Sequence, residues 1–381
     1  MTNTVRPRLL IFNDFFYPAY KAGGPIQSLV NLIIHLNDHY EIAVMTSAYD
    51  LHAKQPIENI IVHEWNTITL PGSTKPIQVW YADIHKGVSS AIKETVKNFK
   101  PDVVYINGMF SYRFVMLPLM LIKNTKIVMS PRGMIQEGAL SGKYLKKKVY
   151  LSLLRWSGLI DKAWWHATTE VEEADVKKLF GKQAITVVAG NIPRMPVTDM
   201  QFAEKQQGKL RLVYLSLITA KKNLLQAIEA INNTSDGVTL HIYGPVKDIS
   251  YWEKCEQAMK KSGGRIEYKG PVIPQKVQST FSAYDAGLFL TKAENFGHAL
   301  YESLSAGRPI ITSFFTPWDN LEMKKAGWNV DIDNVQDIVN TMEKVAAMDR
   351  ASFNEFCIGA HTLANEYFNE GFDIADYKKL F

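Results

Sequence analysis

The hydrophobic positions of the chain form short, almost wholly apolar runs that alternate with stretches of helical period. In the first half, predicted strands cover residues 8–13, 41–46, 102–107, 126–130, 163–169 and 184–188, and predicted helices cover 26–36, 88–99 and 171–180. In the second half, predicted strands cover 210–216, 238–244, 265–270, 286–290 and 309–313, and predicted helices cover 223–231, 251–261, 275–281, 297–306, 335–347 and 350–367. Strands that are apolar on both sides and separated by helices indicate parallel sheets with both faces covered.

The domain organisation follows from length and from one irregular segment. A chain of 381 residues exceeds what one hydrophobic core usually serves, so two domains are expected. Residues 190–201, GNIPRMPVTDMQ, contain two prolines and no hydrophobic period, which marks a junction. We therefore expect two Rossmann-like α/β domains, over 1–195 and 196–361, with the helical end at about 362–381 packing back on the first. Their strand ends would face a cleft, where α/β proteins bind ligands.

The net charge of +5 is unevenly distributed. Residues 1–195 hold 23 Lys and Arg against 15 Asp and Glu, which leaves 20 of the 43 basic and 23 of the 38 acidic residues for the remainder. The basic half indicates an anionic partner or, alternatively, only solvated lysines. Residues 141–160, SGKYLKKKVYLSLLRWSGLI, suit an anionic membrane surface or a core helix with a solvated lysine face. No nucleic-acid-binding motif accompanies the charge, so no nucleic acid partner is expected.

Several features indicate a cytoplasmic chain. The sequence has only two cysteines, Cys255 and Cys357, which suggests a reducing compartment. The start of the sequence lacks the apolar core of a secretory signal. The longest apolar run, FVMLPLML, falls short of the roughly 18 residues that span a bilayer. Peripheral attachment to the inner face of a membrane through residues 141–160 remains open.

Two carboxylates bracket a phenylalanine–glycine step in residues 291–313, TKAENFGHALYESLSAGRPIITS. Glu294 follows a predicted strand and Gly297 would open the next helix, so the amides of residues 295–298 would lie unpaired at the positive helix end. Such an end binds phosphate. Glu302 would lie between one and two turns into the helix, where a carboxylate can accept two hydrogen bonds from a vicinal diol. Alternatively, Glu294 only favours the helix start and Glu302 is solvated.

Three other positions are candidates for anion binding. Paired glycines at Gly23 and Gly24 allow the backbone to approach a ligand closely, or simply form a tight turn. Arg132 follows a strand end, where a guanidinium can bind phosphate or form a structural ion pair. Lys221 and Lys222 open the first predicted helix of the second domain, where positive charge is unfavourable unless an anion binds.

The sequence predicts no metal or cofactor. Asp331-Ile332-Asp333 is the only D-x-D and is interpreted as a loop feature, and the histidines and cysteines lack metal-ligand spacing. Neither a G-x-S-x-G motif nor a P-loop occurs.

The stretch ENFGHALYE, residues 294–302, resembles the E-x7-E motif of the retaining family 4 glycosyltransferases, which have the two-Rossmann GT-B fold. The resemblance covers most of the chain through YPAYKAGGPIQSL, SPRGMIQEGAL, HIYGPV, YKGPV and SLSAGRPIITS. It implies that Glu302 holds the ribose of a nucleotide donor, and that Glu294 contacts the transferred sugar. The same resemblance implies that Gly23 and Gly24 belong to a loop that reaches toward the donor diphosphate and the acceptor.

The resemblance also implies a full set of site residues. The catalytic set would be Glu294, Lys222 and Arg132, and the donor-binding set would be Gly23, Gly24, Lys221, Lys222, Gly244, Asn295, Phe296, Gly297, His298 and Glu302. Relatives place an arginine five or six residues before the lysine, where this chain has Leu217 or Ser216, and many have a histidine near Arg132.

These observations predict a GT-B glycosyltransferase that moves a sugar from a nucleotide-diphosphate sugar to a hydroxyl of a glycan or lipid-linked glycan. The resemblance implies retention and a role in cell-surface polysaccharide synthesis, and the absence of a metal site predicts metal-independent transfer. A nucleotide-sugar epimerase of the same fold and a non-catalytic nucleotide-sugar-binding protein are the alternatives.

Overall fold

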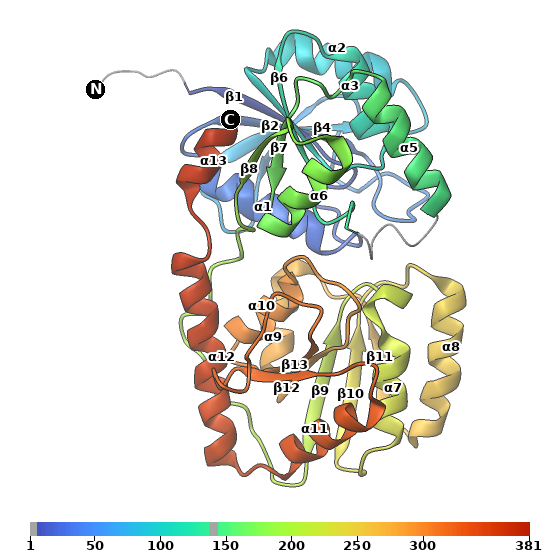
Figure 1. Cartoon of the computed structure of the whole chain (residues 1–381), viewed down its shortest axis with the longest axis vertical. Helices are drawn as coiled ribbons and strands as arrows, with labels where there is room; N and C mark the ends of the chain where they lie inside the picture. The colour runs from blue at the N-terminus through green and yellow to red at the C-terminus, as the bar shows by residue number, and fades with distance from the viewer. Residues whose placement is uncertain (1–5, 137–143) are drawn as a thin grey trace. The chain divides into compact units, whose positions relative to one another are not determined.

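The computed structural model describes residues 6–136 and 144–381 and divides into two compact units. Unit 1 is Met1–Ile192 with Phe372–Phe381, and unit 2 is Pro193–Gly371 (Figure 1). The boundary falls inside the predicted junction. Residues 193–195 and 362–371, which the sequence analysis placed in the first domain, group with unit 2 instead. For the second of these segments the reason is that helix α12 continues unbroken over Arg350–Glu370.

Unit 1 contains an eight-stranded sheet in the order β3-β4-β2-β1-β5-β6-β7-β8. The strands are β1 Arg8–Phe12, β2 Glu41–Ser47, β3 Trp65–Thr69, β4 Pro76–Ala82, β5 Val103–Asn107, β6 Lys126–Ser130, β7 Trp164–Ala167 and β8 Ile185–Val188. All neighbours are parallel except β3 and β4, which the sequence analysis did not predict and which pair antiparallel at one edge.

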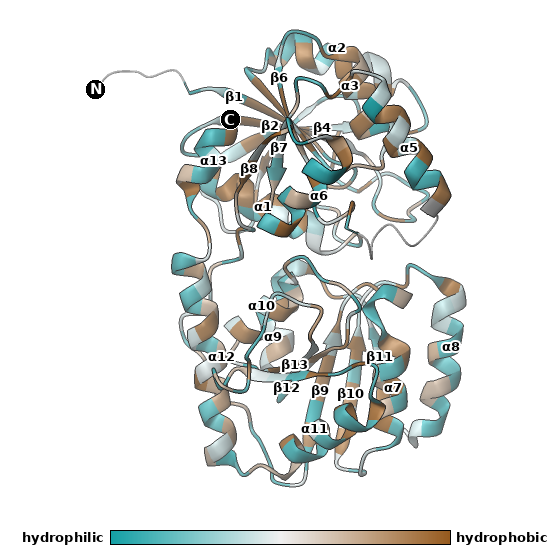
Figure 2. Cartoon of the chain, in the orientation of Figure 1, coloured by the Kyte–Doolittle hydropathy of each residue, from teal (hydrophilic) through white to brown (hydrophobic). Residues whose placement is uncertain are grey.

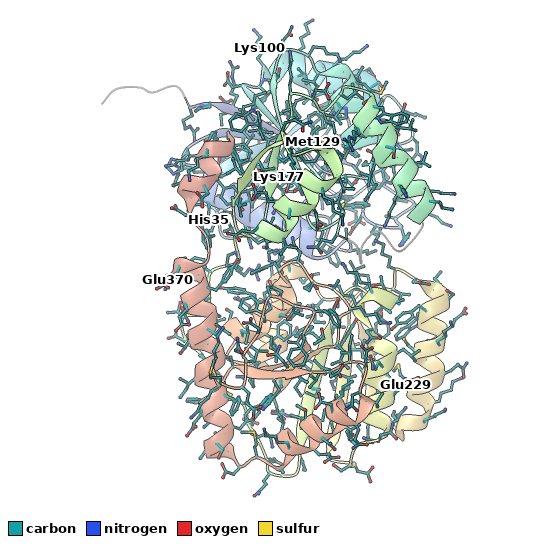
Figure 3. The ribbon with its side chains drawn as sticks, viewed as in Figure 1. His35, Lys100, Met129, Lys177, Glu229 and Glu370 are labelled. Atoms are coloured by element: carbon teal, nitrogen blue, oxygen red, sulfur yellow. The ribbon has the colours of Figure 1, made fainter. Side chains whose placement is uncertain are left out.

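Helices cover both faces of this sheet. They are α1 Gly24–Leu36, α2 Val88–Phe99, η1 Tyr112–Met116 (a π-helix), α3 Leu117–Leu121, α5 Tyr144–Trp156, α6 Glu170–Phe180 and α13 Ile374–Leu380. Alternate residues of β1 pack on opposite faces, Leu9 with α1 and α13, and Leu10 with α2, α3, α5 and α6. Met129 of β6 is fully buried, whereas Lys100, which ends α2, lies at the surface (Figure 3).

Unit 2 contains a six-stranded, wholly parallel sheet in the order β11-β10-β9-β12-β13-β14. The strands are β9 Leu210–Leu215, β10 Val238–Tyr243, β11 Ile266–Gly270, β12 Ala286–Phe289, β13 Ile310–Ser313 and β14 Gly327–Val330, the last of which was not predicted. The helices are α7 Leu224–Asn232, α8 Ile249–Met259, α9 Val277–Ser282, α10 His298–Ser305, α11 Val335–Ala347 and α12, with 3-10 turns at Ala220–Lys222, Lys260–Ser262 and Pro274–Lys276.

Two apolar clusters enclose this second sheet, one formed with α7, α8 and α11 and the other with α9 and α10. Figure 2 shows the same distribution, with brown strands inside each unit and teal in many loops and helix surfaces. Among the helices of the described residues, none has the length and apolar character needed to cross a membrane.

Candidate functional site

The predicted donor site of unit 2 lies at the carboxyl ends of three neighbouring strands. Gly244 directly follows β10, the turn with Lys221 and Lys222 follows β9, and Glu294 follows β12. Because parallel strands end at the same edge of a sheet, these residues share one edge. The sheet order therefore brings together residues that lie up to 73 positions apart in the sequence, from Lys221 to Glu294.

Lys221 and Lys222 do not open a helix, in contrast to the sequence expectation. They lie in the 3-10 turn Ala220–Lys222, and α7 begins only after Asn223, whose φ of 58° is left-handed. The carbonyl oxygen of Lys221 accepts a hydrogen bond from the amide of Lys292 at 2.9 Å. This hydrogen bond connects the turn to the segment that follows β12.

The Lys222 ammonium donates a hydrogen bond to the Glu294 carboxylate, and both side chains are largely buried. The amide of Glu294 in turn donates to the carbonyl oxygen of Phe315 at 2.9 Å, which fixes the backbone beneath the carboxylate. The two residues predicted to contact the diphosphate and the sugar therefore lie within hydrogen-bonding distance of each other. A ligand that binds here would compete with Glu294 for the Lys222 charge.

Helix α10 begins with the geometry that the sequence predicts. Gly297 precedes its first turn with φ of 80°, and an added Cβ would lie 2.9 Å from Leu300 Cδ1. No acceptor among the described residues takes a hydrogen bond from the N–H groups of Phe296 and Gly297. These amides remain available at the positive end of the helix. Asn295 and His298 flank this step at the same end.

The side chain of Phe296 serves packing. Its ring lies buried among Tyr301, Trp318 and Tyr367, and its carbonyl oxygen accepts a hydrogen bond from Trp318 Nε1 at 2.7 Å. This aromatic cluster holds the loop ahead of α10 in place, and of the polar groups of Phe296 only the N–H has no partner among the described residues.

Glu302 is the most unusual residue of this site. Its side chain belongs to a residue that is only 7% exposed, so the alternative of a solvated glutamate is wrong. Burial raises its pKa to about 7, against an opposing influence of Arg194. No described residue donates a hydrogen bond to its carboxylate. Its oxygens are absent from the described side-chain atoms that are both fully buried and unpartnered, so the carboxylate reaches the surface, where hydroxyl donors of a ligand can bind it.

Gly244 contributes by allowing close approach of two backbones. Its φ is 138°, and an added Cβ would lie 1.8 Å from the carbonyl oxygen of Ser216. Its amide donates to the carbonyl oxygen of Gly270 at 3.0 Å and so is not available to a ligand. Gly244 shapes the sheet edge on which Lys222 and Glu294 lie.

The paired glycines of unit 1 end a loop that a distant acid supports. Gly23 has φ of 79° and precedes α1, which begins at Gly24. The Asp50 carboxylate accepts hydrogen bonds from the amides of Tyr20 and Lys21, both at 3.2 Å. Sequence reasoning missed Asp50, because an aspartate after a strand carries no signal of a partner thirty residues earlier.

Arg132 is committed to contacts within unit 1. Its Nε donates to Asn107 Oδ1 at 2.8 Å, its Nη1 to Asn191 Oδ1 at 3.0 Å and its Nη2 to the Tyr105 hydroxyl at 2.8 Å. Each guanidinium nitrogen thus already donates one hydrogen bond to a neutral group. These contacts favour a structural role for Arg132 over phosphate binding. Its partners are neutral side chains, however, and not the carboxylate of an ion pair.

The D-x-D sequence lies in a loop, as predicted. The Asp331 carboxylate accepts a hydrogen bond from the Asp333 amide at 2.9 Å, and Asp337 accepts from the Asp331 amide at 2.8 Å. These contacts form the turn before α11. Over residues 6–136 and 144–381, no group of three or more histidine, cysteine, aspartate or glutamate side chains is arranged to hold a metal ion.

Comparison with known proteins gives a family match for part of unit 2. Residues 209–348, which contain nearly all of the unit 2 residues described above, match the family model of glycosyl transferases group 1. A search of curated proteins by sequence found no match.

Solved structures resemble the chain over its whole length. Sucrose-phosphate synthase from Thermosynechococcus elongatus is 13% identical with a TM-score of 0.75, covering 98% of this chain and 97% of its own. Anabaena HepE in complex with UDP-glucose is 13% identical with a TM-score of 0.67, covering 98% of each chain. WaaG, a glycosyltransferase involved in lipopolysaccharide biosynthesis, is 13% identical with a TM-score of 0.61, covering 94% of this chain and 95% of its own. The predicted fold class is confirmed: the chain is an α/β protein of two Rossmann-like units with the GT-B fold, and its second unit matches the sequence model of glycosyl transferases group 1.

Proposed function

We propose that the chain is a glycosyltransferase that moves a sugar from a nucleotide-diphosphate sugar to a hydroxyl of a glycan or lipid-linked glycan. The observation that carries this proposal is the buried, donorless carboxylate of Glu302, inside the segment that matches glycosyl transferases group 1. The UDP-glucose complex of HepE, a protein of the same fold, supports the choice of donor.

Under this proposal, different groups at the carboxyl edge of the unit 2 sheet bind different parts of the donor. Glu302 accepts two hydrogen bonds from the vicinal diol of the ribose. The free amides of Phe296 and Gly297, with the helix dipole behind them, bind the diphosphate. Lys222 adds a positive charge near the diphosphate, in place of the arginine that relatives have where this chain has Leu217. Glu294 contacts hydroxyls of the sugar.

The reaction breaks the bond between the sugar C1 and the diphosphate oxygen and forms a bond between C1 and the acceptor oxygen, and the proton of the acceptor hydroxyl is released to solvent with the nucleoside diphosphate. The transition state resembles an oxocarbenium ion with negative charge growing on the leaving diphosphate. Preorganised amides and Lys222 stabilise that charge. We further propose retention of the anomeric configuration and a role in cell-surface polysaccharide synthesis, both on the resemblance to family 4 enzymes. On the same resemblance the Gly23–Gly24 loop of unit 1 is assigned to the donor diphosphate and the acceptor, whereas Arg132, whose guanidinium nitrogens already donate within unit 1, is assigned a structural role.

Donor binding is tested first. A thermal-shift panel of nucleoside diphosphates and their sugars identifies the donor, and calorimetry then compares Glu302→Gln with the wild type. Loss of hydrogen bonds to an ion costs roughly 1.5–3 kcal/mol, or about tenfold to 150-fold in affinity. The exposed Glu253→Gln is the matched control and should bind normally. If Glu302→Gln binds the bare nucleoside diphosphate as tightly as the wild type, the donor site is assigned to the wrong residues.

Transfer is tested by analysis of products with and without a carbohydrate acceptor. A new glycosidic bond that forms only with acceptor supports the proposal, whereas conversion of the donor sugar alone would indicate an epimerase. Binding without turnover over a broad acceptor panel would favour the binding protein. We also propose that transfer needs no metal ion, since the D-x-D sequence lies in the turn before α11, where one Asp331 oxygen accepts a hydrogen bond from the Asp333 amide. Activity should survive excess chelator, and its restoration by magnesium or manganese after complete loss would contradict this.

A further inference from the structure

Helix α5 of unit 1 has two apolar faces, of which one is buried. Leu151 and Leu154 lie in the core of unit 1. On the same side the Tyr150 hydroxyl donates a hydrogen bond to the carbonyl oxygen of Met109 at 2.7 Å. These contacts fix which side of the helix packs on unit 1, and therefore also which side faces away from the core. Residues 141–143 of the basic stretch noted in the sequence lie outside the described residues.

The opposite face carries a strip of large exposed apolar side chains, which we call the α5 strip. Leu145 is 75% exposed, Val149 57%, Leu153 62% and Trp156 84%. Their spacings of four, four and three residues place them on one side of the helix. At about 100° per residue they fall within an arc of roughly 80°. The expected core helix with exposed lysines is thus found, since Leu151 and Leu154 are buried and Lys146 and Lys148 are exposed, but the face opposite the core is apolar as well.

Positive charges border the α5 strip on both sides. On a helical projection Lys146 flanks it on one side, and Lys148 and Arg155 flank it on the other, and all three are exposed. Helix α5 contains no aspartate or glutamate. Figure 2 shows this mixture as brown and teal segments that alternate along α5.

We propose that the α5 strip docks unit 1 on the surface of an anionic lipid bilayer. A helix with a narrow apolar face, basic flanks and no acidic residue lies in the plane of such an interface, with the apolar side chains among the acyl chains. Lysine and arginine at the flanks then meet the phosphates of the headgroups. Trp156 at the helix end suits the boundary between headgroups and acyl chains.

Charge complementarity favours lipid over a second copy of the chain. In a symmetric contact between two α5 helices, the basic flanks would face each other with no carboxylate on either helix to pair with them. An anionic headgroup layer presents negative charge along the whole helix. The proposal stands apart from the transfer reaction, because neither Glu302 nor any other unit 2 residue enters it.

The test measures binding of the full chain to vesicles by flotation. Vesicles of phosphatidylcholine alone are compared with vesicles that also contain phosphatidylglycerol. The wild type should bind the anionic vesicles at least tenfold more tightly than the neutral ones, and the preference should fall as salt is raised. The strip variant Leu153→Ser/Trp156→Ser should lose at least tenfold in affinity for anionic vesicles. The charge variant Lys146→Gln/Lys148→Gln/Arg155→Gln should lose the preference for anionic lipid.

A matched control replaces two exposed apolar residues elsewhere, Ile61→Ser/Ile249→Ser, and should bind like the wild type. All these side chains are exposed, so every variant should melt at the wild-type temperature. Equal binding of strip variant and wild type would overturn the proposal, as would absence of binding to anionic vesicles. Sedimentation velocity without vesicles gives a further check. The proposal would also be overturned if the wild type formed a dimer, the strip variant did not, and both bound vesicles equally.

Discussion

Glu302 differs from Glu172, the other buried glutamate among the described residues. Glu172 of unit 1 is fully buried too, but its carboxylate accepts hydrogen bonds from the Gly133 amide, from the Thr168 amide at 2.7 Å and from the Thr168 hydroxyl at 2.8 Å. Glu172 thus has the donors that a structural carboxylate needs. Glu302 has none from the protein, and this contrast within one chain is why we assign it to a ligand.

The raised pKa of Glu302, about 7, makes donor binding depend on pH. Hydroxyl groups of a ribose donate to the carboxylate, so they favour its charged form, which prevails above the pKa. Affinity for the nucleoside diphosphate should therefore rise between pH 6 and pH 8. The Glu302→Gln variant cannot ionise, so subtraction of its pH profile removes the titration of the nucleotide itself. Parallel profiles for the two proteins would show that Glu302 does not touch the ligand.

Lys222 and Lys221 are neighbours with different surroundings, which allows a paired comparison. Lys222 is bound to Glu294 at the site, so Lys222→Ala should lower turnover or donor affinity at least tenfold, by roughly the 1.5–3 kcal/mol of a charge-assisted hydrogen bond. Lys221→Ala should cost less. The double variant Lys222→Ala/Glu294→Gln separates loss of phosphate contact from the effect of an unpaired glutamate. Donor affinity of Lys222→Ala equal to that of Lys221→Ala would mean that backbone amides alone hold the diphosphate.

At the scale of elements, the sequence predicted most strands and helices because their periods are clear. Helices α2 and α11 have the predicted bounds. The sequence analysis missed β3, β4 and β14 for physical reasons. Strand β3 is a partly exposed edge strand in which three of the five residues are polar, β4 begins with a proline, and β14 is only four residues long.

The site could be predicted only in part. The E-x7-E spacing shows which residues stand near the start of α10, but the contact of Lys222 with Glu294 depends on strand order, which no local pattern contains. Periodicity also could not tell which apolar face of α5 is buried, since both faces are apolar. Burial of Glu302 follows from the packing of whole elements around α10.

The close approach of β9 and β10 gives a prediction about Gly244. Gly244→Ala would place Cβ against a backbone oxygen that cannot move without breaking the sheet edge, so we expect unit 2 to lose roughly 3 kcal/mol or more in its free energy of unfolding. Gly263→Ala is the matched control, because Gly263 also has positive φ but has no atom within 4 Å of an added Cβ. It should cost only about 1 kcal/mol. Urea unfolding of both variants measures the difference, and equal costs would refute the steric explanation.

At the scale of the whole molecule, one buried group in each unit should make stability depend on pH, with opposite signs in the two units. In unit 1, His166 is fully buried between the Tyr105 hydroxyl and the Ala189 carbonyl oxygen, and burial lowers its pKa to about 3. The unfolded chain binds a proton at this histidine below about pH 6.5, so unit 1 loses up to about 1.4 kcal/mol per pH unit as pH falls from 6.5 toward 3.

In unit 2, Glu302 changes stability with pH in the opposite direction to His166 in unit 1. Between its ordinary pKa of 4.5 and its folded value of about 7, the folded state binds the extra proton, so unit 2 loses stability as pH rises through this range. Hydrogen exchange of the two sheets at pH 5 and pH 7 measures each unit separately. We expect His166→Gln to flatten the pH response of unit 1 alone and Glu302→Gln that of unit 2 alone. If His166→Gln leaves the response of unit 1 unchanged, this histidine is protonated in the folded state as easily as in the unfolded chain.

Unit 1 takes its last helix, α13, from residues that follow unit 2 in the sequence. On the ribosome, the first 192 residues emerge early but cannot be completed, because Tyr377 and Leu380, which are buried against their sheet, are still to be translated. Unit 2 has its whole sequence once Gly371 has emerged. The unit that is synthesised first is thus finished last. A nascent chain that stalls just before Phe372 would carry a unit 2 with its whole sequence and a unit 1 sheet with the part of one face that α13 covers still exposed, which is the kind of surface that chaperones bind.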